Sequence, residues 1–362
     1  MSDTASVTEW CAQYFGDWWR SQDAEPDARG TSSVDDRLVL ARVDDRRYAS
    51  IQDQVQHASH EMFEFAKAAV RAARKPDGSV EAVNEAERIA YRVDPASGHI
   101  TLIGCGQEAL NLAAARLVRE AARAVLQRDG WTILHASAVV RGDRCLLMLG
   151  DKGSGKTTTA LLLAKRAGWS LLANDRVFVR PDEAGIDVLP WPAAAAIGLG
   201  LLHALGLLGV VQQRLWRGQR LHPTQHPRVT AALGAGDRQP LWDDRGHELK
   251  AQVFPHQLVD WLGLRLERTG RATTLLFPLL DPAARPALRP AARTVCGTDF
   301  FSSDEERYPD FLQLALSCPA LCEHARQRTR ARLAQLPSRS IVLSHDSDRN
   351  ARLLETLGST GE

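Results

Sequence analysis

The chain has 362 residues, a length that favours about two domains. Hydrophobic residues make up 44% and charged residues 25% of it, which excludes collagen-like, coiled-coil and wholly disordered proteins. The 45 basic residues exceed the 44 acidic ones by a single charge, so we expect no bulk binding of nucleic acid.

The cysteines and the N-terminus bear on the compartment. Six cysteines are scattered along the chain, unlike the clustered cysteines of a small disulfide-bonded scaffold. The opening segment MSDTASVTEW has neither the basic nor the apolar region of a secretory signal. Residues 188–211 contain no Asp, Glu, Lys or Arg over a length that can span a bilayer, but their prolines, alanines and glycines favour a buried helix. We therefore predict a cytoplasmic protein that does not insert into a membrane.

Residues 1–128 have the pattern of a smaller α+β domain. Residues 22–36 are polar and predict a loop, whereas residues 55–75 fit a helix or a strand equally well. Asp94-Pro-Ala-Ser-Gly98 is a strong turn signal between two apolar segments. The predicted elements are strands at 38–43, 88–93 and 99–104 and a helix at 107–127. The role of this domain stays open, with binding of an acceptor molecule among the alternatives.

Residues 129–362 begin with the pattern of an α/β domain. A glycine-rich turn separates an apolar strand from a helix rich in Ala and Leu, and further strands follow. The predicted elements, in chain order, are strands at 131–140 and 144–149, the turn at 150–155, a helix at 156–167, a strand at 169–173, and a hairpin of strands at 177–180 and 186–189. This strand–loop–helix–strand order is typical of α/β proteins.

The turn carries a phosphate-binding motif. Gly150-Asp-Lys-Gly-Ser-Gly-Lys-Thr157 matches G-x-x-x-x-G-K-[ST] at every required position. The glycines let successive backbone N–H groups point at an anion, and the helix that follows directs its positive dipole end at the same place. Lys156 can reach the β- and γ-phosphates, and the Thr157 hydroxyl can bind Mg²⁺. We expect ATP to bind through Gly150, Asp151, Lys152, Gly153, Ser154, Gly155, Lys156, Thr157 and Thr158.

We expect Asp175 to complete the site. It ends the strand that follows the helix of the loop, and the carboxyl edge of such a strand lies beside the ligand in α/β proteins. There Asp175 can hold Mg²⁺ together with Thr157 or accept a proton. The alternative is that Asp175 only caps a turn. Arg176 is either structural or neutralises transferred phosphate.

Three segments resemble a known family: His135-Ala-Ser-Ala-Val139, Leu146-Leu-Met-Leu-Gly-Asp-Lys-Gly-Ser-Gly-Lys-Thr157 and Trp169-Ser-Leu-Leu-Ala-Asn-Asp-Arg-Val177. In order and spacing they resemble the catalytic domain of HPr kinase/phosphorylase and its relatives, over residues 135–180. The resemblance implies an α/β P-loop kinase domain of the HPr-kinase type, which uses ATP and Mg²⁺ to phosphorylate a hydroxyl. By position, functional residues of the family align with His135, Gly150, Gly155, Lys156, Thr157 and Asp175.

The chain departs from that family in two places. Asn174 stands where the family has the first carboxylate of an acidic pair, and residues 186–200 differ from its glycine-rich signature. We therefore expect a divergent relative, with Asp175, His135 and Lys156 as catalytic residues. The expected acceptor is a hydroxyl of a peptide, of a protein serine or of a small biosynthetic metabolite.

Two other functions stay open. A loose D-x-x-G motif at Asp243-Asp-Arg-Gly246 fits a GTPase-like regulator, although the chain has no N-K-x-D motif. Asn174 also fits a module that binds nucleotide without transferring a phosphoryl group. The sequence leaves open whether the chain forms a homo-oligomer.

The remainder of the second domain gives weaker signals. Residues 212–247 are polar and predict either a mobile lid or a solvated insertion. Residues 273–280 predict an apolar strand. Cys318-Pro-Ala-Leu-Cys322 and His324 lack a matching second pair of ligands, so we expect ordinary thiols there rather than a metal site.

Overall fold

The structure, a computed structural model, describes residues 5–16, 18–19, 39–96, 99–302, 308–314 and 319–359. It is a mixed α/β protein with several sheets. The chain divides into two compact units that each contain separate stretches of sequence. Unit 1 comprises Met1–Gln13, Ser21–Gly130 and Ser302–Cys322, and unit 2 comprises Tyr14–Arg20, Trp131–Phe301 and Glu323–Glu362.

Unit 1 is built around a six-stranded sheet in the order β1-β6-β5-β4-β3-β2. Strand β1 runs parallel to β6, and the other neighbours are antiparallel. The elements are β1 (Val39–Val43), α2 (Asp45–His57), β2 (Glu61–Phe65), β3 (Ala68–Arg74), β4 (Val80–Asn84), β5 (Ile89–Val93), β6 (Ile100–Gly104) and α3 (Gln107–Arg128). Helix α1 (Ala5–Phe15) begins in this unit.

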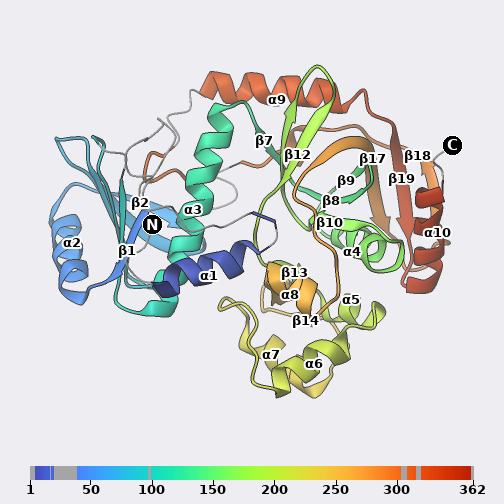
Figure 1. Ribbon diagram of the computed structural model, residues 1–362, viewed down its shortest axis with the longest axis horizontal. Helices are drawn as coiled ribbons and strands as arrows, with labels where there is room; N and C mark the ends of the chain where they lie inside the picture. The colour runs from blue at the N-terminus through green and yellow to red at the C-terminus, as the bar shows by residue number, and fades with distance from the viewer. Residues whose placement is uncertain are drawn as a thin grey trace. The chain divides into compact units, whose positions relative to one another are not determined.

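Helices α2 and α3 cover opposite faces of this sheet (Figure 1). Successive strand residues point to opposite faces. Ala90 therefore packs in the cluster that contains α2, whereas Tyr91 packs in the cluster that contains α3. Strand β4 is buried along its whole length because both of its faces are covered.

Unit 2 is built around a nine-stranded sheet. Its main path runs β10-β8-β9-β17-β12-β11-β7, with β19 beside β17 and β18 beside β19. The strands of this sheet are β7 (Thr132–Leu134), β8 (Ala136–Arg141), β9 (Arg144–Leu149), β10 (Ser170–Ala173), β11 (Val177–Pro181), β12 (Ile186–Pro190), β17 (Gly270–Leu280), β18 (Ala287–Pro290) and β19 (Ser338–Leu343). Strands β9, β17 and β19 are parallel, as expected of an α/β core.

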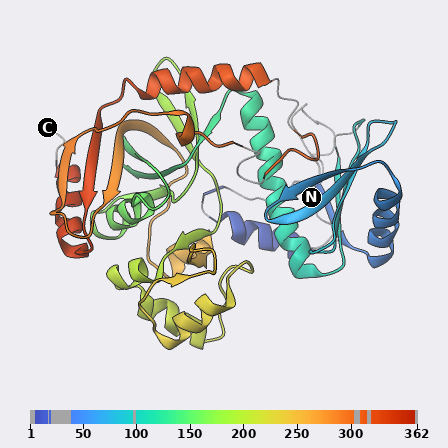
Figure 2. The same cartoon turned by 180° about the vertical axis from the view of Figure 1, so that it is seen from behind.

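Helices and two small sheets complete unit 2. Figure 2 shows α4 beside α10, and the two helices pack against each other. Leu146 of β9 lies in the hydrophobic cluster of α4, whereas Leu147 lies in the cluster on the other face. The remaining elements are α4 (Lys156–Arg166), β13 (Ala195–Ile197), α5 (Leu199–Ala204), α6 (Leu208–Trp216), α7 (Pro227–Ala235), β14 (Leu241–Trp242), β15 (Glu248–Leu249), β16 (Ala251–Val253), α8 (Pro255–Asp260), the short 3₁₀ helix η2 (Gly297–Asp299), α9 (Pro319–Leu333), which begins in unit 1, and α10 (Ser347–Ser359).

Several predicted elements are confirmed. The structure bears out the hairpin of β5 and β6, the long helix α3, strand β9, helix α4, the hairpin of β11 and β12, and strand β17. Residues 55–75, which fitted a helix or a strand, contain the end of α2 and the hairpin of β2 and β3. The predicted loop at 22–36 and Cys318 lie outside the described residues.

Two predicted elements are wrong. The helix expected over residues 188–211 is instead the end of β12, strand β13, helix α5 and the start of α6. Gly206 separates the two helices at a φ of +71°, a conformation that a helix cannot contain. The strand expected over 131–140 breaks at His135, because β7 pairs with β11 whereas β8 pairs with β9 and β10. The apolar pattern shows no break there because both strands are buried.

Among the described residues, no helix combines the length and the hydropathy needed to cross a membrane.

Candidate nucleotide site

The glycine-rich turn of residues 150–155, called the phosphate loop below after its motif, lies where β9 ends and α4 begins. Gly150, Gly153 and Gly155 have φ values of +152°, +86° and +101°, which residues with a side chain rarely adopt. A Cβ atom on Gly150 would lie 2.8 Å from the Ser154 Oγ. The glycine-rich sequence is therefore required by the path of the backbone, which turns from the strand into the helix within six residues.

Several strands reach the same edge of the sheet as this loop. In the antiparallel pair β8–β9, Ala136 at the start of β8 lies opposite Leu149 at the end of β9. Ala173, at the end of β10, pairs near the start of β8. The chain thus brings residues 135, 150 and 174 to one edge, where α/β proteins bind their ligands.

Lys156 is the first residue of α4 and folds back over the loop. Its Nζ donates to the carbonyl oxygens of Gly150 at 2.5 Å and Asp151 at 3.1 Å. Burial lowers the pKa of Lys156, and the nearby charge of Arg293 lowers it further. The carboxylates of Asp175, Asp151 and Asp299 oppose this shift of the pKa. Lys156 is thus an ammonium that is partly removed from water and is stabilised by the charge of three carboxylates.

The backbone carbonyl of Asn174 links the end of β10 to helix α4. Its carbonyl oxygen accepts hydrogen bonds from the Thr157 Oγ1 at 3.3 Å and the Ser137 Oγ at 2.5 Å. Asn174 is 5% exposed, whereas the side chain of Asp175 is 57% exposed. Of these two residues, Asp175 is therefore the one that offers its side chain to a ligand.

The oxygen atoms near the loop suit Mg²⁺ bound together with a nucleotide. Within the described ranges, no three His, Cys, Asp or Glu side chains gather into a metal site. The Thr157 hydroxyl contacts the Asn174 carbonyl, and the next residue in the chain, Asp175, provides an exposed carboxylate. Mg²⁺ is commonly held by one or two such groups together with phosphate oxygens, so these residues fit that ion.

His135 occupies the junction between β7 and β8. Its backbone N–H donates to the Asp299 carbonyl at 2.8 Å, and its ring centroid lies 6.0 Å from that of Phe301. The half-buried imidazole is thus at the edge of the sheet that holds the phosphate loop.

Arg176 lies between the acidic and the aromatic parts of the site. Its Nη1 is 3.7 Å from the Asp175 Oδ2, and its Cζ lies 5.4 Å from the ring centroid of Phe301 and 5.8 Å from that of Trp191. Trp191 is 2% exposed and stacks on Phe178, with ring centroids 5.2 Å apart. This aromatic cluster is packed core, on which the guanidinium of Arg176 rests.

The structure also brings Arg293 and Asp299 to this site, which sequence reasoning missed. Both charges act on Lys156, although more than a hundred residues separate them from the phosphate loop. Asp299 is 3% exposed and forms two hydrogen bonds with Arg293, of 2.9 and 2.6 Å. No motif or periodicity marks either residue, so no signal in a single sequence could have found them.

Other residues considered from the sequence form local contacts. The Lys165 Nζ donates to the Leu262 carbonyl at 2.8 Å, and Lys250 pairs with Glu248 at 3.3 Å. Asp243 accepts hydrogen bonds from the backbone N–H groups of Arg245 and His247, so it shapes the turn between β14 and β15. Lys152 is exposed on the phosphate loop itself.

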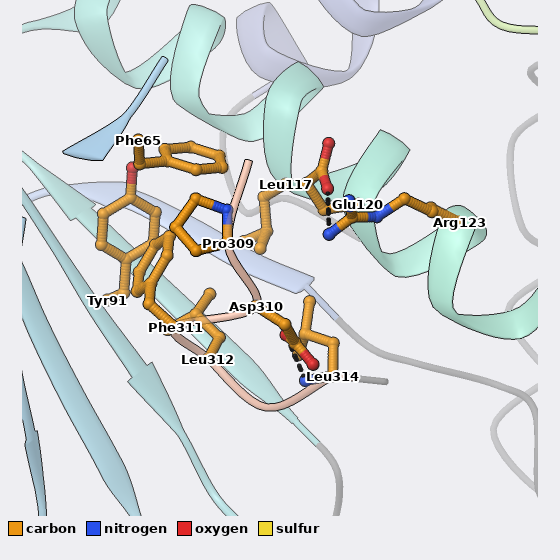
Figure 3. Close-up of a pocket in the computed structure, with 10 residues that line it drawn as sticks. All are labelled: Phe65, Tyr91, Leu117, Glu120, Arg123, Pro309, Asp310, Phe311, Leu312 and Leu314. Atoms are coloured by element: carbon orange, nitrogen blue, oxygen red, sulfur yellow. Dashed lines mark hydrogen bonds and ion pairs between the residues drawn. The ribbon is translucent and has the colours of Figure 1, made fainter. Parts of the chain in front are cut away.

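Two cavities lie in unit 1, and neither is lined by a residue of the phosphate loop. Figure 3 shows the first, between α3, the sheet and residues 308–314, with a volume of about 10 Å³. That is room for about one water molecule, so this space is a packing gap rather than a ligand site. The second has a volume of about 390 Å³ and is lined by Asp44, Arg46, Arg47, Ser50, Ile51, Gln54, Glu81 and Arg92.

No protein-family model matches the chain, and no curated protein matches it either.

Proposed function

We propose that the protein is an ATP- and Mg²⁺-dependent kinase of the HPr-kinase type. In this proposal it transfers the γ-phosphoryl group to a hydroxyl of a peptide, a protein serine or a small metabolite. The observation that carries it is the strand–loop–helix of β9 and α4, with three glycines at positive φ and Lys156 at the start of the helix. Asp175 supports phosphoryl transfer in particular, because its exposed carboxylate adjoins the residue that binds Thr157.

The chemistry proceeds by positioning and by charge stabilisation. The acceptor oxygen forms a bond to the γ-phosphorus while the bond to the bridging oxygen breaks, and that electron pair leaves on ADP. The backbone N–H groups of the loop and the ammonium of Lys156 stabilise the negative charge that develops. Asp175 takes the proton of the acceptor hydroxyl, and His135 lies at the same edge to assist it.

The metal ion has a limited part in this scheme. Mg²⁺ bound with ATP would neutralise phosphate charge, and Thr157 and Asp175 are the residues that would hold it. Because the Thr157 hydroxyl already contacts the Asn174 carbonyl, its position beside the strand end is fixed by the fold.

The test is transfer from γ-labelled ATP in the presence of Mg²⁺ and an extract of the native host, with mass analysis of the labelled product. The wild-type chain should label an acceptor, and Lys156→Ala should label none while its circular dichroism spectrum stays unchanged. Lys250→Ala is the matched control, since that lysine pairs with Glu248 outside the loop. Labelling by Lys156→Ala at the wild-type rate would contradict the proposal.

One observation favours a second candidate, a module that binds nucleotide without transfer. Asn174 is buried, and its side chain is uncharged where the resembled family has a carboxylate. Its backbone carbonyl serves a structural role, because it accepts a hydrogen bond from the Ser137 Oγ. Tight binding of ATP without labelling of any acceptor would select this candidate.

A further inference from the structure

The loop that follows β18 is hydrogen-bonded to β19 at one end and to β7 and His135 at the other. The Ala292 N–H donates to the Ser340 Oγ of β19 at 2.9 Å. At the other end, the Asp299 carbonyl accepts from the His135 N–H, and the Phe301 N–H donates to the Ile133 carbonyl at 2.9 Å. These anchors fix residues 292–301 against the junction of β7 and β8, at the edge that carries the phosphate loop.

Within this loop, Asp299 holds the guanidinium of Arg293 in one orientation. The two side chains form a bidentate pair, and the Asp299 Oδ2 also accepts from the Cys296 N–H at 2.9 Å. The Arg293 Cζ lies 4.7 Å from the ring centroid of Phe277 on β17. A guanidinium held on two sides in this way loses little further freedom when it binds a ligand.

The pair lies beside the start of the phosphate loop. Phe277 precedes Pro278, whose carbonyl oxygen would be 3.8 Å from a Cβ atom placed on Gly150. Arg293 and Asp299 are also among the charges that act on Lys156. Two routes through the structure, the β17 contact and the His135 contact, therefore place this pair at the same edge.

The two partners differ in their access to solvent. The side chain of Asp299 is 3% exposed and that of Arg293 is 32% exposed. An anion that arrives from solvent therefore meets the guanidinium rather than the carboxylate. In the part of the chain that the structure describes, no group accepts from the Arg293 Nε, and only Asp299 accepts from its Nη2. At least two N–H donors of Arg293 thus stay available for a ligand.

We propose that Arg293 is a second cation of the site, which binds the phosphoryl group during transfer, and that Asp299 is the positioning residue that holds it. This inference rests on the proposed function, since it assigns a role in the same transfer. The bond changes are those given above, and Arg293 donates hydrogen bonds to the equatorial oxygens of the transferring group without taking part in proton transfer. A protein that lacks a carboxylate at residue 174 can still stabilise the transition state through an added cation.

The test compares ADP with ADP plus aluminium fluoride, a mimic of the planar phosphoryl group, and needs no knowledge of the acceptor. The wild-type chain should bind the mimic complex more tightly than ADP alone. Arg293→Ala should lose at least ~10-fold of affinity for the mimic complex and keep its ADP affinity within about 3-fold. Its turnover of ATP should fall by ~100-fold or more. Arg293→Lys should retain part of the affinity for the mimic complex and part of the turnover. Free guanidinium should partly restore the turnover of Arg293→Ala.

The positioning role of Asp299 is tested by a double-mutant cycle. Asp299→Asn keeps an acceptor oxygen but loses the charge, so it should lower turnover less than Arg293→Ala does. The double variant should be no worse than Arg293→Ala, because Asp299 acts through the arginine. If the loss of turnover in the double variant equals the product of the two single losses, the positioning role is contradicted, since Asp299 would then act on the reaction by itself.

The matched control is Arg271→Ala, because Arg271 also forms two hydrogen bonds with carboxylate oxygens, one with Asp182 and one with Asp187. It lies near the start of β17, away from the phosphate loop, so the turnover of Arg271→Ala should equal that of the wild type.

A wild-type chain that binds no ATP overturns the proposed function and this inference together. An active wild type whose Arg293→Ala variant binds the mimic complex equally well overturns the inference alone. Thermal unfolding of each variant shows whether it is folded, and Arg293→Lys takes the place of Arg293→Ala if the alanine variant does not fold.

Discussion

At the scale of single residues, Lys156 is an ammonium whose surroundings make its charge sensitive to pH. Burial and the charge of Arg293 lower its pKa, and the carboxylates of Asp175, Asp151 and Asp299 only partly restore it. A lysine with a lowered pKa loses its proton at a lower pH than an ordinary lysine does. A phosphate-binding role for Lys156 therefore has a pH signature.

We predict an alkaline limb in the pH profile of kcat/KM, with its midpoint below the ordinary lysine value of 10.5. Activity should be present while Lys156 is protonated and should fall as the pH rises through its pKa, because kcat/KM reports groups of the free enzyme. Lys156→Arg should move this limb to higher pH, since guanidinium stays protonated. An unchanged midpoint in Lys156→Arg would show that another group causes the limb.

At the scale of elements, the strand, loop and helix around Gly150 agree closely between sequence and structure. Strand β9 and the start of α4 fall on the residues predicted for them, because an apolar run, a glycine-rich turn and an Ala- and Leu-rich segment are local signals. The backbone at Gly150 shows why the turn needs glycine, since its φ is +152° and a Cβ atom would meet Ser154.

We predict that Gly150→Ala and Gly142→Ala have similar effects on stability but different effects on ATP binding. Gly142 has a φ of +60° in the turn between β8 and β9, and a Cβ atom there meets nothing within 4 Å. Both substitutions should lower the free energy of unfolding, by about 1–3 kcal/mol for each strained backbone. Only Gly150→Ala should also weaken ATP binding, by ~10-fold or more, because the N–H groups of the loop move. Urea unfolding and ATP titration measure the two effects, and equal ATP affinity in both variants would contradict the role of the loop.

Other elements could not be predicted, because tertiary pairing decides them. The break at His135 arises from a change of strand partners, which leaves no trace in the apolar pattern of residues 131–140. Residues 188–211 have the composition of a buried helix but form two strand segments and two short helices. Arg293 and Asp299 reach the site through contacts between distant segments, such as the pairing of β17 with β9 and the hydrogen bond between Asp299 and His135.

At the scale of the whole molecule, the two units are each completed by distant parts of the sequence. Unit 1 receives residues 302–322 from the C-terminal part of the chain. Phe311 is 5% exposed there, with its ring centroid 5.0 Å from that of Phe65 and 5.4 Å from that of Tyr91. The sequence offered no hint of this docking, because residues 308–314 are too few to show a periodic pattern.

We predict that Phe311→Ala destabilises unit 1 by about 3–5 kcal/mol, the usual cost of truncating a buried phenylalanine. Differential scanning calorimetry should show the same transition lowered by Phe311→Ala and by Phe65→Ala, with the other transition unmoved. Met62→Ala is the control, because Met62 belongs to unit 1 and is 57% exposed. If Phe311→Ala moves the transition that Phe65→Ala leaves unchanged, the assignment of residues 308–314 to unit 1 is contradicted.

The most direct measurement is the affinity of the protein for ATP with Mg²⁺, by isothermal titration calorimetry of the wild-type chain and of Lys156→Ala. Lys250→Ala is the control, since it removes a lysine of the same unit outside the phosphate loop. We predict saturable binding at one site in the wild type and in Lys250→Ala, and binding at least ~10-fold weaker in a folded Lys156→Ala. Absence of binding in the wild type, or equal affinity in all three chains, would contradict the claim that residues 150–158 bind a triphosphate.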